Sequence, residues 1–379
     1  MRETSSREAT PSRETLRSLS PSSPGPTNFP ATAADSGPRP RGALRRVLRW
    51  RGVPASGLGL VSLILVAVIQ PGFLTASQLT PFFAAYGPVA IIAVGVAFTL
   101  LVGGIDLSVG PVMGVCAIMT VLLSSVGTHF LSAGPSGVAA LCADPGVCER
   151  GLPFALVVVI VIMVGAVFGL LNGIAISVFR LQPLVATLAM GFVAAGLSLY
   201  LMPQPGGQMP QGPLTWYSGA AIISVPLELL VLYVVLAAIL MRTPLGVRMR
   251  AVGSHRWKAF TSGIAINRIS MAAYVASGTS AAVAGVLLTL NSGSADPSIG
   301  VEYTLTAVAG AVLGGTALRG GWADPFGPAI GVLTLGLLSE LVTVAKVPTY
   351  YAQLTTGIII LGGLTVTQVL LRRSNRTTS

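Results

Sequence analysis

Long apolar runs separated by short polar segments dominate the chain from residue 53 onward. A helix needs roughly 20 mostly apolar residues to cross the hydrocarbon core of a bilayer. The pattern predicts an all-α polytopic membrane protein with about ten transmembrane helices. The eighth run has about 14 residues and is predicted to be broken or re-entrant. The expected spans are residues 53–70, 82–102, 109–126, 153–179, 182–202, 222–241, 269–290, 304–317, 326–345 and 351–371.

The apolar tract from Phe82 to Ser124 must contain a break. As one helix its 43 residues would extend roughly 64 Å, about twice the thickness of the hydrocarbon core. A polar, glycine-rich segment interrupts it, and a carboxylate at membrane depth costs about 2.5–3.5 kcal/mol on insertion scales. Asp106 or Ser108 is expected to cap the helix that restarts at Val109, and a role in a translocation path is a compatible alternative. The candidate hinge residues are Gly103, Gly104, Asp106, Ser108 and Gly110.

Glycines spaced four residues apart recur inside the apolar runs. Small residues at this spacing let helices approach closely, so we expect these positions to serve helix packing and not ligand binding. The pairs are Gly110/Gly114, Gly169/Gly173, Gly310/Gly314 and Gly327/Gly331.

The distribution of charge predicts the topology. Charged residues make up 9% of the chain and the formal net charge is +11, a sign that also occurs in proteins that bind nucleic acid. Ten spans, however, place 21 of the 23 Lys and Arg residues on one side, as the positive-inside rule requires of the cytoplasm. We therefore expect no nucleic-acid partner, a multi-pass protein of the cell membrane, and cytoplasmic termini. Residues 1–50 are expected to form a disordered basic, Ser- and Pro-rich tail, 51–372 the membrane domain and 373–379 a short C-terminal tail.

The sequence predicts no catalytic site, no metal site and no cofactor in this chain. Neither lysine follows a glycine, so the Gly-Lys of a phosphate-binding loop is missing. Three cysteines and two histidines offer no metal-ligand or nucleophile arrangement. Cys142 and Cys148 fall in an expected outside loop, where they could pair as a disulfide, whereas Cys116 lies alone in an apolar run.

One long internal cytoplasmic loop, residues 242–268, has the pattern of a docking segment. Ser254 is a plausible N-cap and Gly263 a plausible C-terminal stop, which predicts a helix over 255–262. Such a helix is too short to be stable alone, so we expect it to dock on a partner. The candidate coupling residues are Gly246, Arg250, Ala251, Gly253, Ser254, Ala259 and Gly263.

Several ordered motifs carry a resemblance to a known family over roughly residues 53–371. They are the string from Gly104 to Gly110, the segment Pro183 to Leu188, the loop motifs from Thr243 to Ile264, and the segment from Ala307 to Gly321. Together they resemble the permease subunits of ATP-binding-cassette sugar importers of the ribose, xylose, arabinose and galactose type.

The resemblance implies a set of partners and a pathway. Two permease chains, identical or related, would form the pore in the bilayer, and two ATPase subunits carrying ATP and Mg²⁺ would dock on the 242–268 loops. An extracytoplasmic binding protein would deliver a monosaccharide. A neutral sugar needs no countercharge, so small and hydroxyl-bearing positions would suffice along the path. Beside the hinge residues, the candidates are Thr187, Gly314, Gly315 and Thr316.

Three alternatives remain open on the residues alone. A permease for nucleosides or branched-chain amino acids would share the architecture, although a zwitterion would call for polar or charged groups at mid-membrane. A gradient-driven secondary transporter or channel would act without ATP. An intramembrane enzyme would need a nucleophile with a base or a metal set, and both histidines, His129 and His255, fall outside the expected spans.

Overall fold

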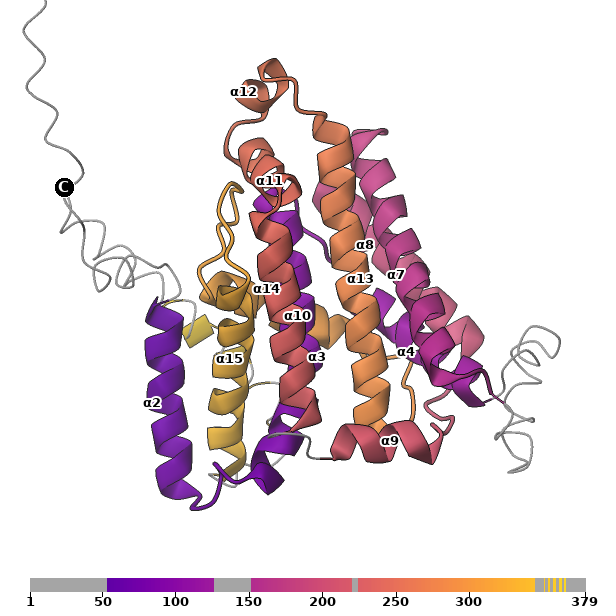
Figure 1. The fold of residues 1–379 in the computed structure, drawn as a ribbon, viewed down its shortest axis with the longest axis vertical. Coiled ribbons are helices and arrows are strands. Elements are labelled where there is room, and N and C mark those ends of the chain that lie inside the picture. Colours follow the sequence, from indigo (N-terminus) through magenta and orange to yellow (C-terminus); the bar gives the residue numbers. More distant parts are fainter. Residues whose placement is uncertain are drawn as a thin grey trace, which may run out of the picture. The chain divides into compact units, whose positions relative to one another are not determined.

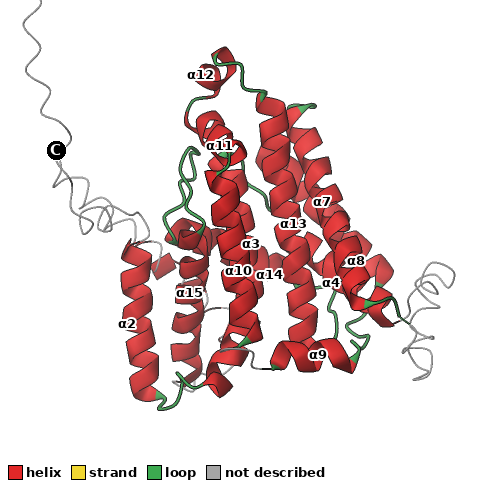
Figure 2. Cartoon of the chain, in the orientation of Figure 1, coloured by secondary structure: helices red, strands yellow, loops and turns green. Residues whose placement is uncertain are grey.

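The computed structural model describes residues 53–125, 151–219 and 224–344, and seven isolated positions between 351 and 365. Within these ranges the chain is helical and contains no β-strand (Figures 1 and 2). The helices are α2 (Val53–Ile69), α3 (Ala76–Leu101), α4 (Val109–Ser125), α7 (Phe154–Ser177), α8 (Pro183–Leu201), α9 (Gln211–Ser218), α10 (Val225–Arg242), α11 (Pro244–Ser254), α12 (Arg256–Thr261), α13 (Ile266–Ser292), α14 (Gly300–Leu313) and α15 (Phe326–Val344).

Six of these helices are long and apolar enough to cross a membrane: α3, α7, α8, α10, α13 and α15. The apolar helices α2, α4 and α14 are shorter. Helix α14 corresponds to the eighth predicted span, which was expected to be short and broken or re-entrant. The predicted span at 351–371 and both predicted tails, 1–50 and 373–379, lie outside the continuously described ranges. Helix α9 was not predicted, because its 8 residues are too few to form a recognisable apolar run.

Helices α3 and α13 form the centre of the described bundle. They are the most buried of the six long helices, whereas in α7, α8 and α10 only about a third of the residues or fewer are buried. Their exposed side chains are large and apolar, as the outward faces of α7 and α8 show at Met163 and Phe192. In water such faces would be unfavourable, but against lipid tails they need no cover.

Close glycine contacts hold the helices together, as the spacing of the glycine pairs predicted. Gly165 and Gly169 of α7 pack directly on the backbone of α13, at Gly278 and Val275. A methyl group added at Gly169 would lie only 2.8 Å from the Val275 Cα. The pairs in α14 and α15 meet in the same way, because Gly310 and Gly314 face Gly331 and Gly327. These glycines therefore serve backbone packing.

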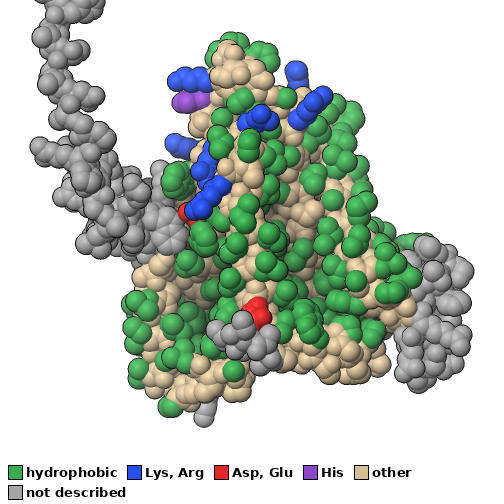
Figure 3. Space-filling model, viewed as in Figure 1, with side chains coloured by type: hydrophobic (Ala, Val, Ile, Leu, Met, Phe, Trp, Pro, Cys, Tyr) green, Lys and Arg blue, Asp and Glu red, His purple; other side chains and the backbone are tan. Residues whose placement is uncertain are grey.

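The basic side chains of the described ranges gather at one end of the bundle. Figure 3 shows Lys and Arg around the end that carries α11 and α12, with hydrophobic side chains spread over much of the remaining visible surface. Antiparallel packing of α7 on α13 brings the turn after α7, with Arg180, to this same end, since Gly173 lies against Met271 near the start of α13. This asymmetry agrees with the charge pattern of the sequence.

Candidate functional site

The predicted break in the apolar tract from Phe82 to Ser124 is confirmed. Helix α3 ends at Leu101 and α4 begins at Val109. The end of α3 is a Schellman turn, in which Gly103 N–H donates to Leu100 O (2.9 Å) and Gly104 N–H to Thr99 O (2.9 Å). Gly103 has φ +81°, a left-handed conformation that residues with a Cβ rarely adopt. The glycines therefore end the helix and turn the chain toward Asp106.

Asp106 is the centre of a buried hydrogen-bonded cluster. Its side chain is 1% exposed, and its Oδ1 accepts from the backbone N–H (3.0 Å) and the hydroxyl (2.7 Å) of Ser108. Its Oδ2 accepts from the Ser277 hydroxyl of α13 (2.8 Å). Asn172 of α7 completes the cluster by donating from Nδ2 to the Ser108 hydroxyl oxygen (2.8 Å). The carboxylate therefore ties the break to α13 directly and to α7 through Ser108, and these hydrogen bonds offset the cost of burying it.

The capping of α4 differs from the prediction. Asp106 bonds the N–H of Ser108, one residue before the helix, and the N–H of Gly110 inside the helix donates to Thr304 Oγ1 of α14 (3.0 Å). Thr187 of α8 accepts from the Leu107 N–H (3.1 Å). The orphan N–H groups at the start of α4 are thus satisfied partly by neighbouring helices and not only by the local sequence.

A second glycine turn follows α14 and repeats the first. Gly315 N–H donates to Val312 O (3.0 Å) and Thr316 N–H to Ala311 O (3.1 Å), the same two bonds as at the end of α3. Gly314 packs on the backbone of Gly327. Thr316 is buried, and its hydroxyl has no partner in the described part of the chain.

Substrate contact by the hydroxyl positions stays a prediction. Ser108, Thr187 and Thr316 are all buried in this structure. The Ser108 hydroxyl donates to Asp106, and the Thr187 hydroxyl is 2.9 Å from Pro183 O in its own helix. The observed hydrogen bonds of Ser108 and Thr187 serve the folding of the break, whereas the Thr316 hydroxyl has no partner in the described part of the chain.

The predicted coupling loop contains two helices, α11 and α12. The predicted helix over 255–262 is confirmed as α12, which spans Arg256–Thr261, whereas α11 before it was not predicted. The prediction of Ser254 as the N-cap is wrong, because Ser254 ends α11 and its hydroxyl donates to Ala251 O (3.0 Å). His255 separates the two helices with an extended backbone. The predicted stop at Gly263 is confirmed, with φ +76° and its N–H donating to Phe260 O (3.0 Å).

Some of the other residues of the predicted coupling loop are buried against the bundle, and others are exposed. Gly246 is buried and packs on the Met241 backbone, and Ala259 is the buried residue of α12. Arg250 is half-buried, and its Nε has no hydrogen-bond partner among the described residues. Trp257 and Phe260 are 75% and 62% exposed, with ring centroids 6.0 Å apart.

The loop meets the break through backbone contacts that only glycine permits. A methyl group at Gly253, near the end of α11, would lie 2.9 Å from Leu101 C and 2.6 Å from Gly321 N. Gly321 N–H in turn donates to Leu101 O (2.9 Å). A Cβ at Gly320 would lie 3.0 Å from the Cα of Gly103. We call these five residues, Leu101, Gly103, Gly253, Gly320 and Gly321, the glycine junction.

Sequence reasoning missed four residues around the break: Asn172, Ser277, Thr304 and Tyr274. Polar side chains inside apolar runs were the available signal, but nothing in the sequence shows which of them meet. The ring of Tyr274 needs the space that Gly104 leaves, since a methyl there would lie 3.2 Å from Tyr274 Cζ. Cys142 and Cys148 lie outside the described residues. In the described ranges no group of three or more His, Cys, Asp or Glu could hold a metal ion.

Comparison with known proteins decides the family. The family described as "Branched-chain amino acid transport system / permease component" matches residues 79–364, a range that includes the break, the coupling loop and both glycine turns. The chain belongs to this permease family. It is therefore a multi-pass membrane transport component and not a catalytic enzyme.

Individual relatives align with this permease over most of their length. It is 28% identical over 314 residues to the ribose import permease protein of Haemophilus influenzae, covering 81% of this chain and 90% of that relative. It is 33% identical over 310 residues to the ribose import permease protein of Bacillus subtilis, covering 80% and 89%. It is 28% identical over 326 residues to the fructose import permease protein of Bifidobacterium longum, covering 82% and 88%. No solved structure matches the permease.

Proposed function

We propose that this chain is the permease subunit of an ATP-binding-cassette importer and forms the translocation path for a monosaccharide of pentose or hexose size. Relatives are named for ribose and fructose import, and others from Escherichia coli and Azospirillum brasilense for D-allose and L-arabinose transport. The family description names branched-chain amino acids instead. Asp106 favours the sugar, because three donors of its own chain already occupy its carboxylate and leave little of it for a substrate ammonium group.

The energy for transport is proposed to arrive through the loop. Val247, Trp257 and Phe260 are exposed, and with the exposed cations Arg248 and Lys258 they form what we call the docking surface. Trp and Arg are among the residue types that contribute most binding energy at protein interfaces. An ATPase subunit with an apolar, acidic groove would fit this surface, and ATP and Mg²⁺ would be bound there, outside this chain.

The glycine junction is the observation that carries the proposal. It joins the docking loop directly to the last residues of α3, within a few residues of Asp106. A displacement of α11 cannot be absorbed by side chains at this point, because backbone meets backbone. Movement of a docked ATPase would therefore be passed to the break, which four neighbouring helices hold in place.

The proposed topology has ten spans with both termini in the cytoplasm. The end of the bundle with α11, α12 and the described basic residues is then the cytoplasmic one (Figure 3). The pore would be formed by two permease chains, either two copies of this chain or this chain with a related one. An extracytoplasmic binding protein would deliver the sugar to the opposite end.

Co-purification from the native membrane tests the proposal. The tagged chain should bring down an ATP-binding-cassette ATPase and a substrate-binding protein, and the ligand in that binding protein would identify the sugar. Recovery of the chain alone, together with uptake by membrane vesicles from an ion gradient without ATP, would contradict the proposal and favour a secondary transporter.

A further inference from the structure

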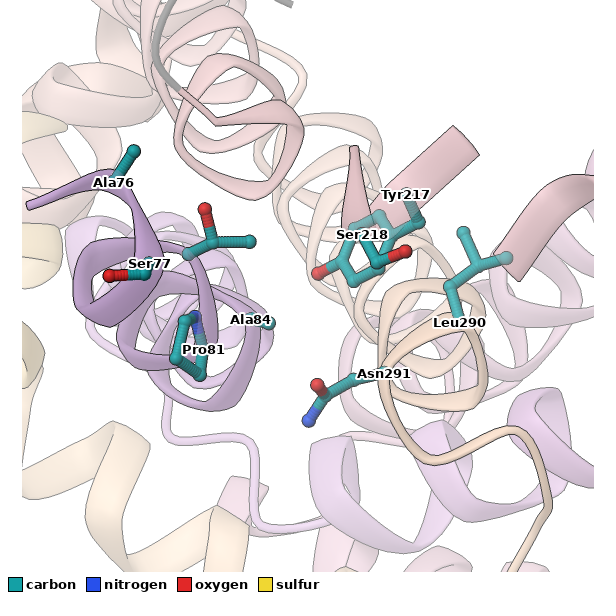
Figure 4. Close-up of a pocket in the computed structure, with 9 residues that line it drawn as sticks. Ala76, Ser77, Pro81, Ala84, Tyr217, Ser218, Leu290 and Asn291 are labelled. Atoms are coloured by element: carbon teal, nitrogen blue, oxygen red, sulfur yellow. The ribbon is translucent and has the colours of Figure 1, made fainter. Parts of the chain in front are cut away.

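A cavity of about 470 Å³ lies beside α9, at the end of the bundle away from the docking loop (Figure 1). It lies between the start of α3, the short helix α9 and the end of α13 (Figure 4). Its volume is in the range of small-molecule sites in proteins. The lining residues are Ala76, Ser77, Thr80, Pro81, Ala84, Tyr217, Ser218, Leu290 and Asn291.

Tyr217 gives this cavity an unsatisfied polar group. The side chain is 2% exposed, and its hydroxyl has no hydrogen-bond partner in the described part of the chain. Figure 4 shows the hydroxyl directed from α9 into the space between α3 and α13. Burial raises the pKa of Tyr217, so the phenol keeps its proton and remains a donor at neutral pH. A buried hydroxyl without a partner is unfavourable, and a molecule in the cavity would satisfy it.

The other lining groups define the class of ligand. Asn291 extends from α13 toward Pro81, and its amide offers two donors and an acceptor (Figure 4). Ser77, Thr80 and Ser218 add hydroxyl groups to the lining, which contains no charged side chain. A phenol ring, an amide and hydroxyls around a partly apolar space suit a neutral molecule with several hydroxyl groups and C–H faces.

The wall that carries Tyr217 is held in place by backbone hydrogen bonds. Gly206 and Ala295 form an antiparallel bridge with bonds of 2.9 Å and 3.0 Å, and Met209 N–H donates to Gly293 O (2.9 Å). These bonds fasten the segment before α9 to the loop after α13. The two sides of the cavity, at Tyr217 and Asn291, are therefore fixed relative to each other, as a binding site requires.

We propose that this cavity is a receiving site, where a monosaccharide binds after it leaves the delivering protein and before it enters the translocation path. Tyr217 donates to one sugar oxygen and Asn291 bonds neighbouring hydroxyls. The inference rests on the proposed function, because it is the proposed topology that places this end of the bundle outside the cell. It adds a ligand and two contact residues to that function.

Ligand-observed NMR on the full-length chain in lipid nanodiscs tests the site. Saturation transfer is measured with D-ribose, D-fructose, D-allose and L-arabinose, and the affinity of each sugar that responds is titrated. Tyr217→Phe and Asn291→Ala should each raise the Kd roughly three- to tenfold, the worth of one lost hydrogen bond to a neutral group. Tyr200→Phe, on the exposed face of α8, is the matched control and should bind as the unaltered chain does.

Two further measurements, the melting temperature and sugar-stimulated ATP hydrolysis, distinguish a loss of sugar binding from misfolding and from a failure of the proposed function. Tyr217→Phe removes a hydroxyl that has no partner, so its melting temperature should equal or exceed that of the unaltered chain. Saturation transfer from none of the four sugars, or equal affinity in all three variants, would overturn the receiving site. Sugar-stimulated ATP hydrolysis by the assembled complex is measured in parallel. If stimulation persists without binding at this cavity, the importer proposal stands and only the receiving site is overturned.

Discussion

Gly253→Ala is expected to uncouple ATP hydrolysis from sugar binding. The added methyl would lie 2.6 Å from Gly321 N, 2.9 Å from Leu101 C and closer still to the Leu101 carbonyl oxygen. Carbon atoms pack at roughly 3.5–4 Å, so the end of α11 must retreat by roughly 1 Å. The neighbours cannot yield by rotating a side chain, because the atoms that meet are backbone.

The size of the effect follows from this geometry. Overpacking of this kind typically costs about 1–3 kcal/mol, and the displacement also strains the hydrogen bond from Gly321 to Leu101. A change of about 1–3 kcal/mol in the free energy that couples two sites corresponds to a factor of about 5–150. We therefore expect sugar-stimulated ATP hydrolysis to fall at least fivefold, while the hydrolysis without sugar changes less.

The assay uses the complex purified with its ATPase and binding protein and reconstituted in liposomes. ATP hydrolysis is compared with and without the sugar-loaded binding protein. Gly87→Ala is the matched control, because Gly87 is a buried glycine of α3 whose added methyl would meet nothing within 4 Å. Full stimulation in Gly253→Ala, at normal abundance and with the ATPase bound, would refute a mechanical role for the glycine junction.

Substitutions at three further places test other contacts. Asp106→Leu deprives three donors of their acceptor, so its abundance in the membrane should fall at least fivefold, while Asp106→Asn falls less; equal amounts by immunoblot would refute a structural role for the cluster. Trp257→Ala combined with Phe260→Ala should weaken capture of the ATPase at least tenfold in a pull-down without lowering the melting temperature, and unchanged capture would exclude the docking surface. Thr304→Val removes the acceptor of an N–H in α4 and should destabilise by about 1–3 kcal/mol, while Thr304→Ser does not; equal denaturation midpoints would disprove capping from α14.

The positions of the helices could largely be predicted from the sequence. The length of each apolar run places most helix ends within a few residues. The break at Gly103 follows because a single helix over the 43-residue tract would be longer than the membrane is thick. Glycines four residues apart indicated close packing correctly except at Gly114, where an added methyl would meet only the Ser198 hydroxyl at 3.5 Å. These predictions succeed because they depend only on neighbouring residues: on the length of an apolar run relative to the membrane thickness, and on the backbone conformations that glycine allows.

The partners of the break could not be predicted in the same way. Ser277, Asn172 and Thr304 reach the break from helices far away in the sequence, so their role depends on the tertiary arrangement. The failure at Ser254 has a similar cause. A serine before a short polar run fits an N-cap, but the chain continues α11 through Ser254, where Gly253 packs on Leu101 and Gly321.

Uptake of labelled sugar by proteoliposomes is the most direct test of the central claim. The vesicles contain this chain with its ATPase, are loaded with ATP and Mg²⁺, and receive the binding protein outside with D-ribose, D-fructose, D-allose or L-arabinose. The account predicts that at least one sugar accumulates only when ATP and the binding protein are both present, and that Gly253→Ala lowers the accumulation at least fivefold. Uptake from an ion gradient without ATP, or uptake of none of the four sugars by a complex that transports amino acids, would contradict it.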